Sequence, residues 1–371
     1  MRFPEFTKEW EEHALAEYLD FKNGLNPDVK RIGRGLPFIS VMDILADGTI
    51  NYDSIRGKVE ATEREIENFS VEKGDILFLR SSETLEDVGR ANVYMDNRTA
   101  VYGGFVIRGR KIGDYNPLFF KYLLSTPLAR KRTCRMGAGA QHFNIGQDGL
   151  SKISLCFPLM EEQNKIARLL SLIDERIATQ NKIIDKLQSL IKGLRVCCMQ
   201  RNGSNNVYLS EIAQIYQPQT ISSAELTEDG FLVYGANGII GKYKDYNHKT
   251  EQICITCRGN TCGMVNNTKP MSWITGNAMV INTDKYQDKV YKKYLYHYLS
   301  AYNFNSIISG SGQPQIVRTP LEKLKITLPT ISEQKQKAMI LDKVQDKIEI
   351  NHNILNLYIL QKQYLLRQMF I

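Results

Sequence analysis

The chain has 371 residues, of which 48 are Lys or Arg and 40 are Asp or Glu, so its formal net charge is +8. A hydrophobic fraction of 43% with 24% charged residues is typical of a globular protein, and the length favours two or three domains. No apolar run approaches the roughly 18 residues that cross a bilayer, the N-terminal stretch is acidic, and the seven cysteines lack regular spacing. These features argue against a membrane protein or a secreted disulfide scaffold, and we expect a cytoplasmic protein.

The basic balance indicates a polyanionic partner, although solvated basic faces without a partner also give this charge. The position of the basic residues is more informative than their number. The residues that we select as candidate phosphate contacts are Arg108, Arg110, Arg130, Lys131, Arg132 and Arg135 in the first half, and Lys242 and Lys244 in the second.

The first 157 residues predict a mixture of short helices and strands. Apolar runs, turn formers and helix caps place the expected elements in chain order. They are a short helix over 11–18, a strand over 37–41, a turn at 46–48, a helix over 60–69, strands over 74–80 and 101–108, a helix over 116–134, a glycine-rich loop over 137–149 and a strand over 153–157.

A long helix follows, with apolar residues at alternating steps of four and three. This spacing is the a/d seam of a heptad repeat, which lets one helix supercoil against another. The seam residues are Ile166, Leu170, Ile173, Ile177, Gln180, Ile184 and Leu187. An ordinary helical hairpin is the alternative interpretation.

The second half repeats this plan after a linker at 201–206. Its expected strands are 232–234, 253–257 and 278–281, and its expected helix is 291–302. A second seam contains Leu341, Val344, Ile348, Asn351, Leu355 and Tyr358. Because Asn351 occupies the slot that Gln180 has in the first seam, we expect the two amides to face each other and fix the register. Lys337 and Lys362 put charge at the seam's ends, where a snorkelling stem or a loose coil is expected.

Matching residues extend the repeat over the whole chain. The difference in residue number between matching residues of the two copies is the offset. It is 194 at Leu15, 178 between Arg80 and Arg258, 173 between the loops 137–139 and 310–312, and 171 between Gln163 and Gln334. The first copy is therefore 23 residues longer, mostly between residues 38 and 80. Short strands and helices without βαβ alternation predict an α+β fold with a pseudo-two-fold internal repeat. The expected domains are 1–157, a helix at 158–200, the linker at 201–206, a second domain at 207–328 and a helix at 329–371.

Three motifs resemble catalytic or metal sites, and each has a structural alternative. Asn116-Pro-Leu-Phe119 resembles an amino-methyltransferase motif but fits a helix cap, and residues 235–243 resemble a phosphate loop but fit a turn between strands. Cys254, Cys257, Cys262 and His248 suggest zinc, yet Cys254 and Cys257 would point to opposite faces of a strand. We expect no metal site and a non-catalytic chain.

Polar residues in loops beside strand ends suit nucleic acid instead. Arg reads guanine bidentately, Gln and Asn read adenine, and Lys, Ser or Tyr hold phosphates. A solvated loop or a structural cap is the alternative for each single residue. The candidates are Arg80, Ser81, Ser82, Gln141, His142 and Asn144 in the first copy, and Arg258, Asn260, Thr261, Gln313, Gln315 and Arg318 in the second.

The chain resembles the specificity subunits of type I restriction-modification systems. The resemblance rests on the two-copy layout, the junctions at 158–163 and 329–334, the strand at 74–80, the segment 233–241 and the opening 2–10. It implies two target recognition domains separated by two antiparallel coiled-coil helices, with one domain for each half of a bipartite site in double-stranded DNA. It also implies two methyltransferase subunits around the helices and further restriction subunits, with S-adenosylmethionine, ATP and Mg on those partners and no cofactor in this chain.

A second apolar stripe lies off the seam and fits such partner helices, although a broad core-facing stripe is the alternative. Its residues are Leu169, Leu172, Ile183, Leu190, Ile350, Ile354 and Leu357. Two other function classes stay open. One is a self-contained DNA methyltransferase or nuclease, and the other is a scaffold with two protein-binding modules.

Overall fold

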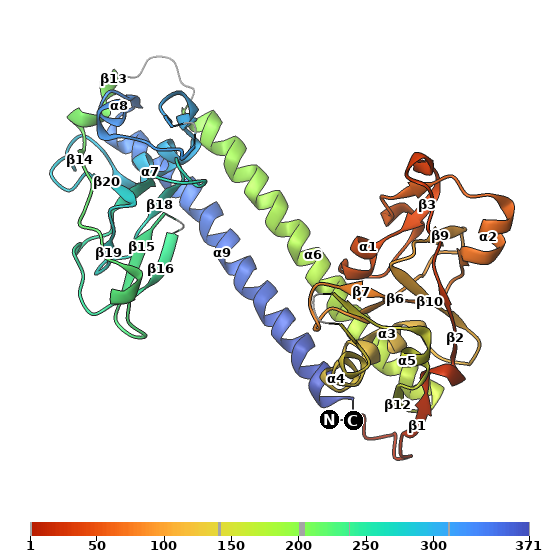
Figure 1. Ribbon diagram of the computed structural model, residues 1–371. Coiled ribbons are helices and arrows are strands. Elements are labelled where there is room, and N and C mark those ends of the chain that lie inside the picture. Colours follow the sequence, from red (N-terminus) through yellow and green to blue (C-terminus); the bar gives the residue numbers. More distant parts are fainter. Residues whose placement is uncertain (1, 140–141, 200–204, 237, 311, 371) are drawn as a thin grey trace. The chain divides into compact units, whose positions relative to one another are not determined.

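The structure is a computed structural model that describes residues 2–139, 142–199, 205–236, 238–310 and 312–370 (Figure 1). It divides into two compact units, residues 1–181 with 354–371 and residues 182–353. Each unit contains one globular copy of the repeat together with parts of the two long helices, α6 (Met160–Met199) and α9 (Ile331–Gln368).

The main sheet of the first unit has four antiparallel strands. Their order is β2 (Leu19–Asn23), β10 (Val106–Lys111), β6 (Ile76–Leu79) and β8 (Ala91–Val93). All four residues of β6 are buried, because successive side chains of a strand point to opposite faces and both faces of this strand are covered. Ile76 and Phe78 join the core with the helix α3 (Pro117–Ser125), whereas Leu77 and Leu79 join the core with a second sheet.

That second sheet has two short strands, β4 (Lys58–Val59) and β5 (Ser70–Val71), from the stretch 38–80 that carries most of the extra length of the first copy. Its order is β4, β3 (Ile32–Ile39), β9 (Ala100–Tyr102) and β5, with β3 and β9 parallel. The helices α1 (Val41–Leu45) and α2 (Glu63–Phe69) lie in the same stretch.

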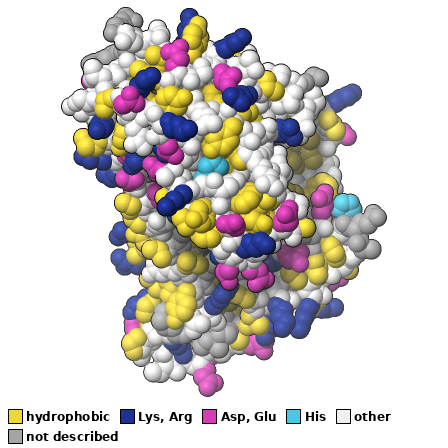
Figure 2. Space-filling model, turned by 90° about the vertical axis from the view of Figure 1, so that its left-hand side faces the viewer, with side chains coloured by type: hydrophobic (Ala, Val, Ile, Leu, Met, Phe, Trp, Pro, Cys, Tyr) yellow, Lys and Arg dark blue, Asp and Glu magenta, His cyan; other side chains and the backbone are white. Residues whose placement is uncertain are grey.

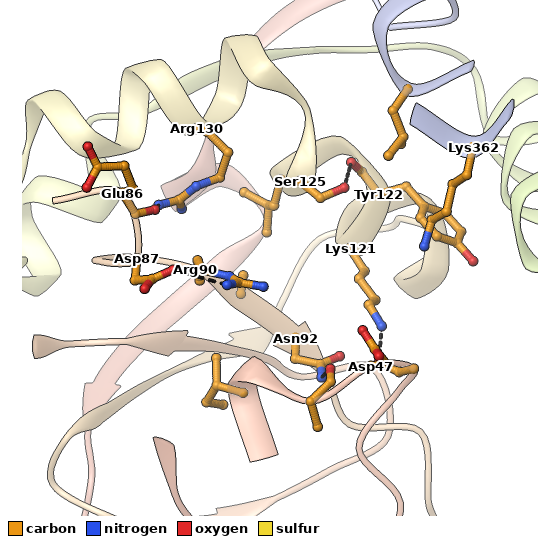
Figure 3. Close-up of a pocket in the computed structure, with 16 residues that line it drawn as sticks. Asp47, Glu86, Asp87, Arg90, Asn92, Lys121, Tyr122, Ser125, Arg130 and Lys362 are labelled. Atoms are coloured by element: carbon orange, nitrogen blue, oxygen red, sulfur yellow. Dashed lines mark hydrogen bonds and ion pairs between the residues drawn. The ribbon is translucent and has the colours of Figure 1, made fainter. Parts of the chain in front are cut away.

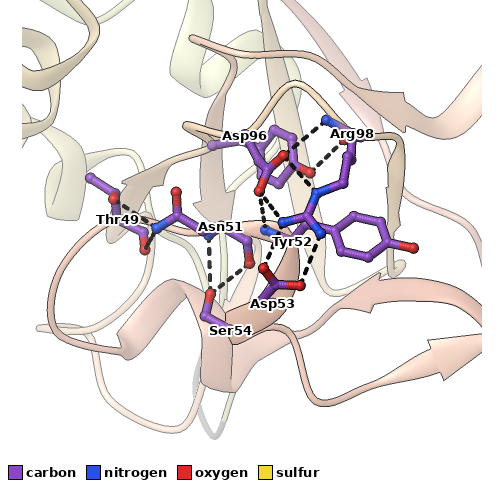
Figure 4. Close-up of polar contacts among 8 residues, drawn as sticks. Thr49, Asn51, Tyr52, Asp53, Ser54, Asp96 and Arg98 are labelled. Carbon is purple, nitrogen blue, oxygen red and sulfur yellow. Dashed lines mark hydrogen bonds and ion pairs between the residues drawn. The ribbon is translucent and has the colours of Figure 1, made fainter.

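A polar network fixes the added segment (Figure 4). The Arg98 guanidinium donates to Asp53 Oδ2 at 2.7 Å and to Asp96 Oδ2 at 2.8 Å, and it lies 4.2 Å from the centre of the Tyr52 ring. These contacts lower the pKa of Asp96, and the hydrogen bond from Arg98 is the largest cause. The backbone amide of Tyr52 also donates to Asp96 Oδ2 at 3.1 Å, so one carboxylate joins two loops.

The second unit repeats the sheet order of the first. Its main sheet is β14 (Gln214–Tyr216), β20 (Ala278–Asn282), β17 (Ile253–Thr256) and β18 (Val265–Asn267), again antiparallel throughout. Its smaller sheet is β16 (Gly238–Tyr243), β15 (Phe231–Gly235) and β19 (Trp273–Ile274), again with one parallel pair. The helix α7 (Lys292–Ala301) corresponds to α3. The predicted internal repeat and the α+β class are confirmed.

Each globular copy is tied to the start of its long helix in the same way. A strand pair closes each copy, β1 (Glu11–Ala14) with β12 (Ser154–Phe157) and β13 (Asn205–Tyr208) with β21 (Lys325–Leu328). Gln163, 3% exposed, accepts from the Asn116 amide at 3.0 Å and donates to the Pro158 carbonyl at 3.0 Å. Gln334, 1% exposed, accepts from the Tyr291 amide at 2.8 Å and donates to the Pro329 carbonyl at 2.9 Å.

The predicted seams are the packed faces of the long helices. In the first unit Ile166, Leu170 and Ile173 of α6 share one core with Leu365 of α9. In the second unit Ile191 of α6 packs with Leu341 and Ile348 of α9. In the second unit Lys337 contacts Cys198 whereas Gln345 contacts Arg195, so the two helices pack antiparallel there. The pairing of Gln180 with Asn351 stays a prediction. Among the described residues, the structure contains no helix long and apolar enough to span a membrane.

The two seam lysines are held by specific contacts. Lys362 Nζ lies 2.6 Å from Asp174 Oδ1, and the Tyr122 hydroxyl donates to the other oxygen of that carboxylate at 2.8 Å. Lys337 Nζ donates to the Cys198 carbonyl at 2.9 Å. Each ammonium therefore has an acceptor at the helix pair, and the choice between a snorkelling stem and a loose coil stays a prediction.

Three local predictions also need correction. The stretch 11–18 is β1 followed by a 3-10 turn, Leu15–Glu17, and not a helix, because β1 pairs with the distant β12. The strand expected at 101–108 is two strands, β9 and β10. The helix expected at 116–134 is α3 and α4 (Pro127–Arg135), because Pro127 ends the first helix and begins the second. Residues 201–204 of the predicted linker lie outside the described residues.

A buried histidine makes the second unit sensitive to acid. His297 is 0% exposed, its Nε2 donates to Asp342 Oδ1 at 2.9 Å, and its Nδ1 accepts from Arg195 Nε at 3.3 Å. Burial lowers the pKa of His297 below 6.5, although Asp342 opposes the shift. As the pH falls, His297 is therefore protonated at a higher pH in the unfolded chain than in the folded protein. Protonation then favours the unfolded chain, and stability falls as the pH drops below about 6.5.

We expect the protection factors of the α7 amides, which correct for the intrinsic pH dependence of hydrogen exchange, to fall between pH 7.5 and pH 5.5. His297→Gln should weaken this pH dependence, and part should remain because burial also lowers the pKa of His248. His352→Gln, on the exposed face of α9, is the matched control and should leave the pH dependence unchanged. An unchanged profile in His297→Gln would contradict the assignment.

Candidate nucleic-acid interface

A short ribbon joins two of the predicted loops of the first copy. The strand β7 (Ser81–Ser82) follows β6 directly and pairs antiparallel with β11 (Phe143–Asn144). Asn144 is exposed, its Oδ1 accepts from the Ser81 hydroxyl, and its Nδ2 donates to the His142 carbonyl at 3.2 Å. The fold thus brings a hydroxyl and an amide, 63 residues apart in the chain, to one surface.

The second copy has the corresponding ribbon, with different side chains. Arg258 forms an antiparallel bridge with Gln315, and both are exposed. A pocket of about 350 Å³ beside them is lined by Tyr216, Gln217 and Arg318 as well. Arg318 belongs to the short helix α8 (Arg318–Glu322), and its Nε lies 2.7 Å from Glu322 Oε1.

Backbone contacts correct the predicted alignment of the two loops. Asn144 bridges Ala138 as Gln315 bridges Ser309, and Asn144 pairs with Ser81 as Gln315 pairs with Arg258. The offset at the glycine loop is therefore 171 and not 173. Arg258 corresponds to Ser81, whereas Arg80 corresponds to Cys257, because Ile145 and Ile316 donate to their respective carbonyls at 3.0 Å.

Several predicted phosphate contacts are engaged within the protein. Arg108 is 6% exposed and donates to the Ser70 carbonyl at 2.6 Å, and Arg110 Nη2 donates to the same carbonyl at 2.8 Å. Arg80 is partly buried, and its Nη1 donates to the Gly104 carbonyl at 3.3 Å.

The basic side chains of α4 differ in their surroundings according to the face of the helix on which they lie. Arg130 donates to the carbonyls of Glu86 and Val88 at 2.8 and 2.7 Å, and Arg132 Nη1 lies 2.7 Å from Glu12 Oε1. Lys131 and Arg135 point to solvent. Only part of this cluster is therefore placed to meet a ligand.

Arg130 also lines a pocket of about 370 Å³ in the first unit (Figure 3). Lys121 and Arg90 point into it from opposite walls. Lys121 donates to the Gly48 carbonyl, burial lowers its pKa to about 8, and Arg90 lies 3.0 Å from Asp87. Because these cations have protein partners, the pocket fits a packing gap between α3 and the first sheet better than an anion site.

The remaining candidates of the second copy lie at the surface. Lys244, Asn260 and Gln313 are exposed, whereas Lys242 pairs with Asp229 at 3.3 Å and the Thr261 hydroxyl donates to the Ala236 carbonyl at 3.0 Å. In the first copy His142 is exposed, and Gln141 lies outside the described residues.

The motifs with catalytic or metal resemblance have structural roles. Asn116 caps α3 by accepting from Leu118 and Phe119 at 3.0 Å. Of the segment that resembles a phosphate loop, Gly238–Tyr243 is the strand β16, which pairs with β15. Cys254 and Cys257 belong to different cores. Within the described part of the chain, no group of three or more His, Cys, Asp or Glu is placed to hold a metal ion.

Sequence reasoning missed one position in each copy, the tip of the turn beside the ribbon. In the first copy Val106 donates to the Gly103 carbonyl at 2.9 Å, and Phe105 at the tip is 65% exposed. In the second copy Ala278 donates to the Thr275 carbonyl at 3.0 Å, and Asn277 at the tip is exposed. The sequence feature that could have identified these positions is a Gly-Phe or Gly-Asn pair between two apolar strands, which is typical of a short turn.

Charge alone does not locate the interface. On the face drawn in Figure 2, lysine and arginine side chains are scattered among acidic and hydrophobic ones. The duplicated ribbon, with hydrogen-bonding side chains that differ between the copies, is the more specific feature. It shows one scaffold present twice in the chain, with different side chains on each copy.

A family model described as the type I restriction modification DNA specificity domain matches residues 7–189 and 202–357. The chain therefore belongs to this family. The relatives described below are specificity subunits, which are the non-catalytic DNA-recognition components of such enzymes.

Relatives and solved structures agree with this assignment. The putative type I restriction enzyme MjaX specificity subunit of Methanocaldococcus jannaschii is 24% identical, with 93% of this chain and 89% of that protein aligned. The Escherichia coli EcoprrI specificity subunit is 32% identical over 140 residues, which is 36% of this chain and only 34% of that protein. The crystal structure of an S subunit from M. genitalium has a TM-score of 0.67 at 15% identity, covers 100% of this chain and 97% of its own, and supports the fold.

Proposed function

We propose that this chain reads a bipartite sequence in double-stranded DNA, with one globular copy for each half-site. The observation that carries the proposal is the duplicated ribbon, with Ser81 and Asn144 in one copy and Arg258 and Gln315 at the equivalent positions of the other. Equivalent scaffolds with different readers are expected for a protein that recognises two unlike half-sites.

The chemistry of the two ribbons differs in a useful way. The guanidinium of Arg258 matches the O6 and N7 acceptors of guanine, whereas the amides of Asn144 and Gln315 match N6 and N7 of adenine. Exposed cations, Lys131 and Arg135 in the first copy and Lys244 in the second, serve as phosphate contacts. Arg108, Arg110, Arg130 and Arg132 are then structural residues.

The long helices are proposed to dock two methyltransferase subunits, which carry S-adenosylmethionine. Restriction subunits with ATP and Mg join through the complex. Five positions of the second apolar stripe support this surface because they are exposed on α6 or α9 outside the seam. They are Leu172, Ile183, Leu190, Ile350 and Leu357, exposed by 50%, 39%, 49%, 56% and 65%. Leaving such side chains in water forgoes the free energy of burial, which a partner would restore.

Co-expression with the methyltransferase subunit tests this function. Sequencing of methylated adenines in host DNA should give a split motif with two short specified halves. Exchange of residues 207–328 for the equivalent domain of another specificity subunit should change one half and leave the other. A change in both halves would overturn the one-copy, one-half-site assignment.

Two other function classes give different results in the same system. A self-contained methyltransferase or nuclease would bind S-adenosylmethionine or cut DNA as an isolated chain. A scaffold would form a stable complex without sequence-specific affinity for DNA. Either outcome would reject the proposed function.

A further inference from the structure

The turn tips next to the two ribbons are held rigidly. In the first copy Arg80, the residue before β7, donates its backbone amide to the Phe105 carbonyl at 2.9 Å and its Nη1 to the Gly104 carbonyl at 3.3 Å. Gly104 lies under Asn26, and any side chain there would overlap the Asn26 amide. The turn therefore presents Phe105 in a defined place beside Ser81.

The second copy builds the same turn with a different tip. Cys257, the residue before Arg258, donates its backbone amide to the Asn277 carbonyl at 3.0 Å. Gly276 lies under Thr220, as Gly104 lies under Asn26. Asn277 is therefore held beside Arg258 as Phe105 is held beside Ser81.

The exposure pattern sets the tips apart from their strands. Residues 100–109 are all buried except Phe105, and residues 274–281 are all buried except Asn277. A phenyl ring in water forgoes the free energy that burial would give, and the strands around it show that this segment otherwise buries its apolar residues. A fixed, exposed aromatic ring beside a polar ribbon is what an apolar contact to a ligand requires.

We infer that the tip residues are specificity determinants of their half-sites. Phe105 contacts the C5-methyl group of a thymine in the major groove, and Asn277 pairs with the N6 and N7 atoms of an adenine. The inference rests on the proposed function and adds a reader to each ribbon. It predicts an A·T pair at the tip position of both half-sites, read through an apolar contact in one and through hydrogen bonds in the other.

Deoxyuridine substitution tests the contact of Phe105, because deoxyuridine lacks only the C5-methyl group of thymine. The complex with the methyltransferase subunit is bound to duplexes in which each thymine of the methylated motif is replaced singly. One substitution in the half-site of the first copy should weaken binding about 4-fold, the value of one buried methyl group. Phe105→Ala should weaken binding to the thymine duplex by at least that factor and abolish the deoxyuridine effect.

Asn277→Ala is the matched variant of the other copy. It should relax one A·T position of the second half-site by about 10-fold or more and leave the first half-site unchanged. Phe21→Leu, a partly buried change in the same sheet as the first turn, is the control for general loosening and should keep the deoxyuridine effect.

The outcomes separate this inference from the proposed function. If the wild-type complex gives a split motif but no thymine of its first half-site is sensitive to deoxyuridine, the inference is overturned and the proposed function stands. A deoxyuridine effect of unchanged size in Phe105→Ala also overturns it, because another residue then makes the methyl contact. Absence of any split motif in the wild-type complex rejects the proposed function itself.

Discussion

Gln334→Leu is expected to destabilise the second unit by about 3 kcal/mol. The Gln334 side chain accepts from the Tyr291 amide and donates to the carbonyls of Pro329 and Lys289, so leucine leaves three backbone groups without their partners. Each such group costs about 1–3 kcal/mol when water cannot replace the partner. Gln163→Leu removes the equivalent clamp and should destabilise the first unit by about 2 kcal/mol, because Gln163 makes two of these bonds.

Guanidinium unfolding followed by hydrogen exchange checks this result and its location. The first protected amide to exchange faster should be that of Tyr291 in Gln334→Leu and that of Asn116 in Gln163→Leu. Gln336→Leu, an exposed position two residues along α9, is the control and should change stability by less than about 0.5 kcal/mol. Equal effects of Gln334→Leu and Gln336→Leu would show that the clamp does not hold the helix to its domain.

The long helices and the duplication could be predicted from sequence because their signals are periodic. A heptad pattern repeats over many helical turns, so it can be recognised in the sequence alone. Gln163 and Gln334 recur at a constant offset, in a region where neither copy has gained residues. The prediction of a helix over 11–18 was wrong for the opposite reason. Its conformation depends on pairing with β12 about 140 residues later, and no local pattern contains that contact.

The candidate interface was predictable in residue type but not in arrangement. Ser81, Asn144, Arg258 and Gln315 were selected as readers, and the fold brings them together in pairs. Arg108 was selected for its charge alone, and its burial depends on the strand face that it occupies. Sequence matching also joined Arg80 to Arg258, because identical residues at neighbouring positions outweigh a shift that only backbone pairing reveals.

Substitution by asparagine is expected to have different effects in the two apolar stripes of α9. In the seam it should lower the stability of the second unit, whereas in the outer stripe it should leave stability nearly unchanged. Leu341 is 0% exposed in a core with Ile191 and Ile348, so Leu341→Asn creates a cavity and buries an amide. The expected loss is about 4 kcal/mol. Ile350, an isomeric side chain in the same unit, is 56% exposed, and Ile350→Asn should leave the melting temperature nearly unchanged.

Binding of the methyltransferase subunit then distinguishes the stripes. If the outer stripe is the docking surface, Ile350→Asn should weaken assembly about 10-fold while the isolated chain stays folded, because a buried aliphatic contact at an interface is worth roughly 1.5 kcal/mol. Ile350→Leu retains the apolar surface and should assemble normally. Assembly unchanged in Ile350→Asn would remove this part of the stripe from the interface, whereas a folded, fully stable Leu341→Asn would contradict the seam.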